Sequence, residues 1–501
     1  MGQQHFDVIV IGAGLSGIGS ACHISKEIPN KSLAILERRE TMGGTWDLFR
    51  YPGIRSDSDM TSFGFQFKPW FSDTVLAKGP DIRNYVLETA EEYKLKDKTQ
   101  FGLKITNANW SSAKQCWQVK ALHEASGEER HFTSSFLMNC TGYYNYDRGY
   151  QPKFGGEEDF SGQVIHPQHW PEDLDYSGKR VVVIGSGATA VTIVPSMGKN
   201  AESVTMLQRS PTYVMSLPDT DKIAMFMNKF MPKSWVFQIT RKRNIWIQRA
   251  LYIACMRWPN AMKNFLLKHI KKEVGPDFDM KHLTPTYNPW DERLCAAPDG
   301  DFFESLRSGQ SSIVTDQVDR FTKNGLLLKS GKKLEADIIV TATGLELQML
   351  GGLQLSLDEK PTNIADQMTY KSAMIQNIPN FSWVFGYTNA PWTLKCDIAS
   401  RYVCRLIKYM DKHDYKVATP VDNNHQQVSA GITDEFSPGY IQRAKDLLPR
   451  QGKTGPWKLE MHYGKDRKTL LKDPVDDGIM KFELAHEASE AINPSHVSLA
   501  Q

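Results

Sequence analysis

The chain has 501 residues and a formal net charge of only +3, from 60 basic and 57 acidic side chains. At about 150 residues per domain, this length predicts two or three domains. The balanced charge provides no broad electropositive surface, so it argues against a nucleic-acid partner.

The sequence shows no sign of export or of a metal site. Its first residues run into an apolar strand, without the basic and apolar regions of a signal peptide. The seven cysteines form no CxxC pair and no metal-like cluster, so we expect reduced thiols and no metal. No uncharged apolar run approaches the roughly 18 residues that a membrane span needs. Together these features predict a cytoplasmic location.

A first glycine-rich turn, residues 12–17, joins an apolar strand to a helix. In such a turn Gly12 permits the tight bend, Gly14 lets the backbone approach a pyrophosphate, and Gly17 lets the helix pack closely. The next strand ends at Glu37, 20 residues beyond Gly17, where an acidic side chain binds a ribose hydroxyl. The complete unit predicts a dinucleotide site.

The loop at residues 43–57 suits close passage of the backbone over a flat ring. It contains a glycine pair, aromatic residues and a Pro-Gly turn, and we expect Gly44, Thr45 and Trp46 to contact the cofactor. A redox cysteine pair is absent from it, which disfavours dithiol chemistry. Asp57 could serve the site or simply cap its own turn.

Residues 160–171 read Phe-Ser-Gly-Gln-Val-Ile-His-Pro-Gln-His-Trp-Pro and lie between two nucleotide-binding turns. The histidine, His166, could act as a general base. A histidine in a linker between cofactor domains can equally hold that linker by hydrogen bonds, and we favour this positioning role.

A second turn follows the strand at residues 181–184, with Gly185, Gly187 and Ala190 in the three key positions. The strand after it ends in Arg209 and Ser210, where the first unit has an acid. A carboxylate there would repel a 2′-phosphate, whereas Arg209 can bind it. The second site should therefore prefer NADPH to NADH, unless Arg209 is only a solvated surface residue. Two dinucleotide sites imply electron transfer between two cofactors, with FAD at the first turn.

Residues 235–272 mix aromatic, aliphatic and basic side chains. Such a stretch could rest on a membrane surface as a peripheral contact. It could also be a helical insertion packed on the core, which is the interpretation we favour because most amphipathic helices bury one face.

Three further segments are noteworthy. Residues 288–295 contain Glu292 and Arg293, and this arginine could serve the site or form a surface ion pair with an acidic neighbour. Residues 337–344 read as a buried strand that ends in a small-residue turn. Residues 140–142 form a similar turn, and we expect both to mark places where the chain crosses between domains.

Taken together, these motifs resemble those of type I Baeyer–Villiger monooxygenases. Residues 160–171 resemble the F-x-G-x-x-x-H-x-x-x-W-P fingerprint of that family, and residues 43–57 resemble a second family signature. The fingerprint positions are Phe160, Gly162, His166, Trp170 and Pro171. Residues 143–146 and 165–176 are most similar to the ethionamide-activating mycobacterial group within the family.

The resemblance implies roles for three polar residues. Arg293 matches the catalytic arginine, and Asp57 would lie by the flavin and hold that arginine. Some members carry a lysine just before the arginine to grip the 2′-phosphate. The Glu292 found in this chain weakens the expected preference for NADPH.

The expected architecture is an α/β fold with two Rossmann-like dinucleotide-binding domains and a mainly helical insertion. An FAD-binding domain would comprise residues 1–145 and 345–501, the latter with the C-terminal region. An NADPH-binding domain would comprise residues 146–215 and 286–344, and residues 216–285 would form the insertion.

The activity implied by the resemblance is the conversion of ketones to esters or lactones with NADPH and O2, through a C4a-peroxyflavin. Sulfur oxidation in thioamides or sulfides is a further implied reaction. Two alternatives stay open. One is a flavin-containing monooxygenase specialised in S- or N-oxygenation, against which Trp170 and Pro171 argue. The other is a non-oxygenating NADPH-dependent flavin reductase, which would need no dedicated cation such as Arg293.

Overall fold

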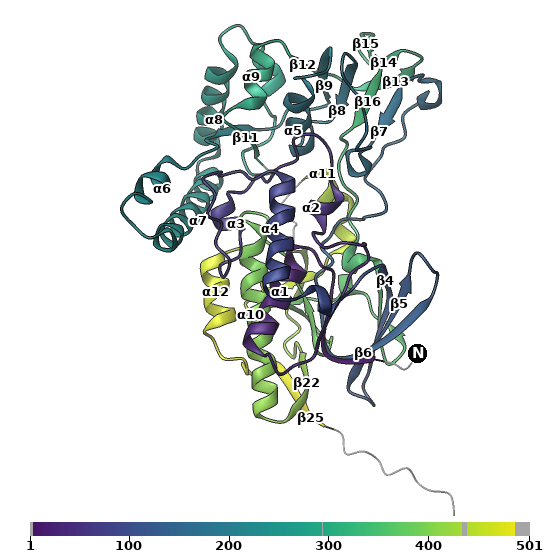
Figure 1. Cartoon of the computed structure of the whole chain (residues 1–501), viewed down its shortest axis with the longest axis vertical. Helices are drawn as coiled ribbons and strands as arrows, with labels where there is room; N and C mark the ends of the chain where they lie inside the picture. Colours follow the sequence, from purple (N-terminus) through teal and green to yellow (C-terminus); the bar gives the residue numbers. More distant parts are fainter. Residues whose placement is uncertain (1–3, 293, 433–437, 486–501) are drawn as a thin grey trace, which may run out of the picture.

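A computed structural model describes residues 4–292, 294–432 and 438–485 of the chain. Two α/β bodies lie one above the other in Figure 1, and a group of helices extends from the side of the upper body. Each body is built around its own sheet, and one of the two glycine-rich turns follows a strand of each sheet.

The lower body contains an 11-stranded sheet. Its strands are β1 (Gln4–Ile11), β2 (Leu33–Leu36), β3 (Thr99–Gln100), β4 (Leu103–Ser111), β5 (Cys116–His123), β6 (Glu129–Asn139), β17 (Gln354–Leu357), β18 (Lys360–Pro361), β19 (Thr369–Tyr370), β20 (Met374–Ile375) and β21 (Phe381–Trp383). The main path is β18-β17-β4-β5-β6-β1-β2-β3. Because β1 pairs in parallel with both β2 and β6, the carboxyl ends of these strands share one edge of the sheet.

Helices cover one face of this sheet. They are α1 (Leu15–Glu27), α2 (Thr45–Leu48), α3 (Met60–Phe63), α4 (Gly79–Glu92), α10 (Trp392–Lys412) and α12 (Tyr463–Leu471), whereas α11 (Gly439–Arg443) packs in the core on the other face. Alternate residues of β1 face two separate cores, as strand geometry requires. Val8 and Val10 pack with α1 and α10, whereas Ile9 and Ile11 pack with the residues of β5 and β6. Two outlying strand pairs are β22 (Tyr415–Pro420) with β25 (Met480–Leu484), and β23 (Gln427–Gly431) with β24 (Arg450–Gly452).

The upper body contains a five-stranded parallel sheet in the order β12-β9-β8-β16-β7. The strands are β7 (Gln163–Ile165), β8 (Arg180–Ile184), β9 (Ser203–Gln208), β12 (Ser311–Thr315) and β16 (Ile338–Thr341). An antiparallel set, β13 (Val318–Thr322), β14 (Gly325–Leu328) and β15 (Lys333–Glu335), packs beside it. Helices α5 (Ala188–Met197) and α9 (Asp301–Arg307) complete the body.

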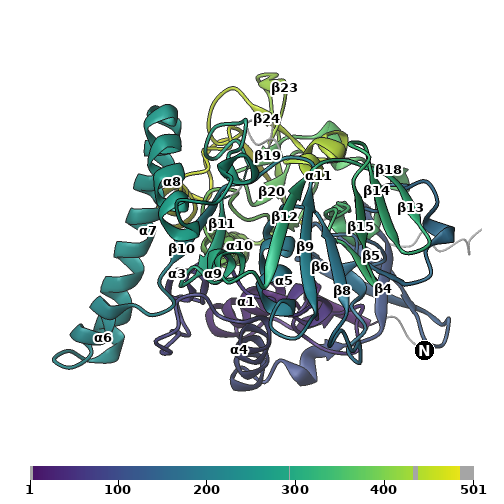
Figure 2. The same cartoon turned by 90° about the horizontal axis from the view of Figure 1, so that it is seen from above.

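Three helices leave the upper body between its two halves: α6 (Lys222–Met227), α7 (Lys233–Arg257) and α8 (Pro259–Val274). A short parallel pair, β10 (Val214–Leu217) and β11 (Cys295–Pro298), lies where the chain leaves and returns. Seen from above, α7 forms the outer left edge of the molecule (Figure 2). Within the described ranges, no helix is both long enough and apolar enough to cross a bilayer.

The chain crosses between the two bodies twice, and the two crossings are hydrogen-bonded to each other. The backbone N–H of Asn145 donates to the carbonyl of Glu346 (2.9 Å), and that of Tyr150 donates to Gly344 (3.1 Å). The hydroxyl of Thr343 also donates to the carbonyl of Tyr150 (2.6 Å). The two bodies are therefore joined by a paired link.

The α/β fold class with two Rossmann-type units is confirmed. The first strand is longer than the apolar pattern indicated, because β1 begins at Gln4. Residues 4–6 pair with β6 through their backbones, and the exposed, polar side chains of Gln4 and His5 give no apolar signal.

Candidate active site

The first turn can be built only with glycine at two positions. Gly12 has φ +98°, and a Cβ on it would lie 2.9 Å from the Cys140 carbonyl oxygen. A Cβ on Gly17 would lie 1.8 Å from the carbonyl oxygen of Gly12. Within the described part of the chain, no side chain caps the start of α1. Its first N–H groups are therefore available to an anion such as a pyrophosphate.

A cavity of about 230 Å³ opens beside this turn. The second turn lies outside its lining. Six of the residues expected to bind cofactor line it: Gly12, Gly14, Glu37, Gly44, Thr45 and Trp46. Gly44 has φ +56°, and a Cβ on it would lie 2.7 Å from the Cα of Gly14. Two backbone segments thus cross closely in the cavity wall, while Gly17 lies behind it in the packing of α1.

Glu37 is buried at the end of β2. Its carboxylate accepts hydrogen bonds from the backbone N–H groups of Ala13 (2.5 Å) and Arg39 (2.8 Å). Burial raises the pKa of this carboxyl, and the two N–H donors oppose the shift. Glu37 is therefore fixed at the cavity wall, with acceptor capacity left for a ribose hydroxyl.

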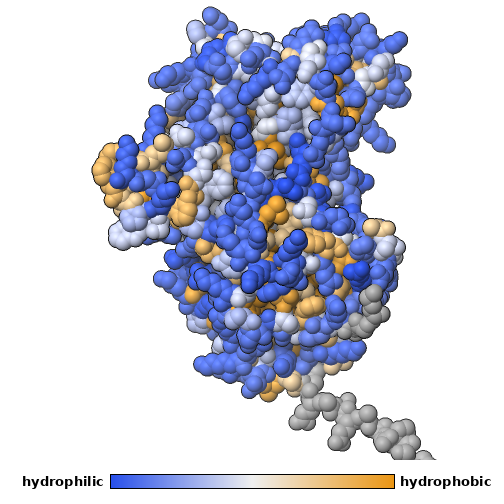
Figure 3. All heavy atoms as spheres, viewed as in Figure 1, coloured by the Kyte–Doolittle hydropathy of each residue, from blue (hydrophilic) through white to orange (hydrophobic). Residues whose placement is uncertain are grey.

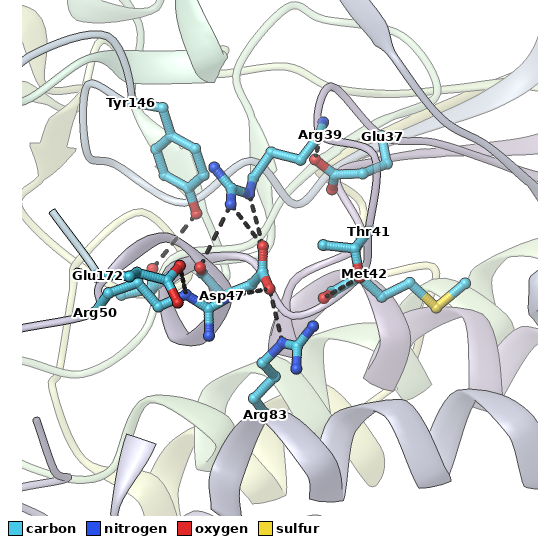
Figure 4. Close-up of polar contacts among 10 residues, drawn as sticks. Glu37, Arg39, Thr41, Met42, Asp47, Arg50, Arg83, Tyr146 and Glu172 are labelled. Carbon is cyan, nitrogen blue, oxygen red and sulfur yellow. Dashed lines mark hydrogen bonds and ion pairs between the residues drawn. The ribbon is translucent and has the colours of Figure 1, made fainter. Parts of the chain in front are cut away.

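Asp47, which the sequence analysis did not single out, is the centre of a charged cluster (Figure 4). Its side chain is 1% exposed and accepts hydrogen bonds from Arg39 (2.6 Å), Arg50 (2.7 Å) and Arg83 (2.7 Å). Burial opposes ionisation, but the arginines lower the pKa of Asp47 overall. Three cations around one anion order the loop that carries Thr45 and favour an anionic ligand nearby.

The second turn repeats the geometry of the first. Gly185 has φ +144°, and a Cβ on it would lie 2.3 Å from the carbonyl oxygen of Ala342. Ala190 is fully buried against the sheet. A Cβ on Gly187, by contrast, would meet no heavy atom within 4 Å. Packing among the described residues therefore does not require glycine at 187.

Arg209 and Ser210 are exposed directly after β9. The charge of Arg209 acts on Glu292: burial raises the pKa of the Glu292 carboxyl, and Arg209 opposes that shift. The fold therefore brings together the cation expected to bind a 2′-phosphate and the acid that departs from the family pattern.

Loop residues 51–57 extend from the first turn to the second. A Cβ on Gly53 would lie 1.9 Å from the hydroxyl of Ser196 in α5. Burial raises the pKa of Tyr51 to about 12; a hydrogen bond with Thr189 lowers it, and the charge of Asp57 adds to the increase. Asp57 is exposed, and its charge acts on Tyr51, which contacts Thr189 at the start of α5. Arg293 lies outside the described residues, so its pairing with Asp57 remains a prediction.

The fingerprint residues pack the linker onto the upper sheet. Phe160 and Trp170 are buried in its two cores, and Pro171 is exposed. A Cβ on Gly162 would lie 2.2 Å from the carbonyl oxygen of Asp337, just before β16. Four of these five residues, Phe160, Gly162, His166 and Trp170, have contacts that hold the segment in place.

His166 bonds to one segment of the paired link, and its neighbour Gln168 bonds to the other. The Nε2 of His166 lies 3.3 Å from the Gly344 carbonyl oxygen, which can only accept, and its Nδ1 accepts from the Gln168 N–H (3.2 Å). This pattern requires the neutral ring with a proton on Nε2. Burial also lowers the pKa of His166. The Gln168 side chain, which the sequence analysis did not select, donates to the Asn145 carbonyl (2.7 Å).

Comparison with known proteins identifies the family. The model of flavin-binding monooxygenase-like proteins matches residues 6–349. The chain belongs to this family. It is 55% identical to putative FAD-containing monooxygenase MymA of Mycobacterium tuberculosis, over 96% of this chain and 98% of the relative. It is 47% identical to FAD-containing monooxygenase EthA of the same organism, over 96% and 98% of the two chains.

Among solved structures, oxidized steroid monooxygenase bound to NADP is similar, with a TM-score of 0.75 and 20% identity over 96% of this chain and all of that one. At this identity the match shows the fold alone. As a member of the flavin-binding monooxygenase-like family, the chain is a flavin-dependent monooxygenase, which confirms the enzyme class predicted from its sequence.

Flavin content tests the first turn. Gly17→Ala places a methyl group against the Gly12 carbonyl, so α1 must shift away from the turn at a cost of about 1–3 kcal/mol or more. We expect purified Gly17→Ala to bind FAD at least about tenfold more weakly, measured by absorbance during titration with FAD. Gly187→Ala is the matched control and should bind FAD as the parent does. Equal FAD affinity in Gly17→Ala and the parent would contradict this account.

Proposed function

We propose that the protein is a Baeyer–Villiger monooxygenase that uses FAD, NADPH and O2 to convert ketones to esters or lactones. The observation that carries the proposal is the pair of matching glycine turns, one in each body, joined by the hydrogen-bonded link that the fingerprint residues hold. The relatives named as FAD-containing monooxygenases support the first cofactor. The steroid monooxygenase of similar fold, solved with NADP, supports the second.

The lower cavity has the features that FAD requires. Gly14 and Gly44 give its pyrophosphate close access to the backbone, the start of α1 faces the phosphates, and Glu37 would hold the ribose. Bound flavin supplies the activation of O2 after it has been reduced by NADPH. The protein contributes binding, orientation and exclusion of water.

We assign the second turn to NADPH. Gly187 leaves the backbone open to the pyrophosphate, and Arg209 with Ser210 would bind the 2′-phosphate. Glu292 competes with that phosphate for Arg209 because both are anions beside one cation. This competition predicts a modest preference for NADPH over NADH.

The catalytic roles are assigned to Arg293 and Asp57. A fixed guanidinium stabilises the negative charge that develops on oxygen while the ketone is attacked. Asp57 would orient that guanidinium from the loop that reaches α5. A site with a dedicated cation for an oxygen anion would serve oxygenation as well as electron transfer, which distinguishes the proposed enzyme from a flavin reductase.

We further propose the domain division that the sequence suggested, with the FAD-binding domain in residues 1–145 and 345–501. Strands β17 to β21 return to the sheet begun by β1, which supports the second of these ranges. Residues 146–215 and 286–344 would form the NADPH-binding domain, and residues 216–285 the helical insertion. Pairing of β10 with β11 across the ends of that insertion supports these boundaries.

Product analysis with a simple ketone, NADPH and O2 tests the proposed reaction. The parent should form ester. Arg293→Ala should keep FAD and still be reduced by NADPH, but its rate of ester formation should fall by about 100-fold or more, because one stabilising charge is lost. Parental ester rates in Arg293→Ala would refute the assignment. Oxidation of sulfides but never of ketones by the parent would identify the S-oxygenating alternative, and NADPH consumption without oxygenated product would identify a reductase.

The Michaelis constants for NADPH and NADH test the phosphate site. Arg209→Ala should raise the constant for NADPH by about tenfold or more, because a charge-assisted hydrogen bond is lost, and leave that for NADH nearly unchanged. Glu292→Gln should lower the constant for NADPH by up to about fivefold, since it removes a competing charge. Equal effects of Arg209→Ala on both nucleotides would show that this side chain does not bind the phosphate.

A further inference from the structure

The helical arm, defined as residues 222–272, has an unusual charge. It contains twelve lysines and arginines and neither aspartate nor glutamate. The remaining residues hold 48 basic and 57 acidic side chains, so the rest of the chain is net negative. Positive charge is therefore concentrated on the one part of the protein that extends from its side (Figures 1 and 2).

The side of α7 that faces the protein buries the apolar Val236, Phe237 and Cys255 and also carries polar side chains with specific partners. Arg241 is buried, and its guanidinium donates to the carbonyls of Thr61 (2.7 Å), Ser62 (3.1 Å) and Gly64 (2.9 Å). Asn244 and Gln248, three and seven residues further along, donate to the carboxylate of buried Asp59 (2.8 and 2.6 Å). At 3.6 residues per turn these three side chains share one face of the helix.

The opposite face of α7 is apolar and cationic. Trp235, Ile239, Trp246 and Ile253 follow at intervals of four, seven and seven residues, and their exposed fractions are 64%, 42%, 70% and 42%. Lys242 and Arg249 lie in the same stripe. Helix α7 therefore departs from the usual amphipathic arrangement, because a stripe of apolar side chains faces outward in addition to the side chains buried on its inner face.

The adjoining helix α6 extends this surface. Ile223, Met225, Phe226 and Phe230 are exposed in or just after it. Twelve of the fifteen large apolar side chains that are exposed in the described ranges belong to residues 223–265. Figure 3 shows this surface as the hydrophobic patch on the left-hand projection. Helix α8 differs, because its Ile270 and Val274 are buried in the core of the upper body.

We propose that the arm docks on the surface of a bilayer with anionic headgroups, through α6 and the outward stripe of α7. Aromatic side chains interleaved with lysine and arginine fit the interface between acyl chains and negative headgroups. A symmetric contact with a second copy would place two acid-free cationic arms together, which electrostatic repulsion disfavours. Packing on the core, the interpretation that the sequence favoured, holds for α8 and for the inner face of α7, so the proposed contact concerns α6 and the outward stripe of α7.

Flotation of the FAD-loaded full chain with lipid vesicles tests the proposal. The protein should float with vesicles of equal parts phosphatidylcholine and phosphatidylglycerol, and at least about tenfold less with phosphatidylcholine alone or in high salt. Trp235→Ser with Trp246→Ser should reduce binding by about tenfold or more, because it removes the two largest outward anchors. The matched control is Leu447→Ser with Leu484→Ser, which are 48% and 60% exposed outside the arm and should bind as the parent does.

A second variant, Lys242→Glu with Arg249→Glu, leaves the apolar stripe intact and should also reduce binding by about tenfold or more. FAD content and NADPH consumption in solution, measured in each variant, verify the fold. Failure of the parent to bind anionic vesicles, or equal binding to neutral ones, would overturn the proposal. So would sedimentation that shows dimers of the parent which Trp235→Ser with Trp246→Ser abolishes, because the arm would then bind a second copy.

Discussion

The paired link between the two bodies is the constraint on which the rest of the site depends. The first glycine of each turn lies against a carbonyl of a crossing segment, Gly12 against Cys140 and Gly185 against Ala342. The crossings are bonded to each other, and His166 bonds to one of them and Gln168 to the other. The shape of each nucleotide turn and the spacing between the turns are therefore set by the same backbone.

This constraint explains why the fingerprint contains so few reactive groups. Phe160 and Trp170 fill cores of the upper body, and Gly162 permits close approach to the Asp337 carbonyl. His166 is neutral in the hydrogen bonds that it makes, which suits a structural bond better than proton transfer at this position. The segment that carries the family fingerprint in the sequence thus has a structural role, because it holds together the two crossings that lie beside the glycine turns.

The sequence predicted what depends on local spacing and missed what the fold assembles from distant residues. The strand, glycine turn and Glu37 follow one another along the chain, so their geometry could be read directly. The Asp47 cluster combines arginines at 39, 50 and 83, and no spacing rule relates them. Which face of α7 turns outward could not be predicted for a related reason: its composition indicates two faces, but contacts with Asp59 and the α3 carbonyls help determine which one turns inward.

The coupling of NADPH consumption to product formation tests the role of the link most directly. His166→Ala and Gln168→Leu each remove a bond to the crossings, whereas His123→Ala removes an exposed bond to Ser126, away from the link. With a ketone substrate, the first two variants should keep FAD but form less ester and more hydrogen peroxide per NADPH, because a loosely held site admits water. The His123→Ala variant should remain coupled. Unchanged ratios of ester and peroxide to NADPH in His166→Ala and Gln168→Leu would show that the link does not position the two cofactor sites for the reaction.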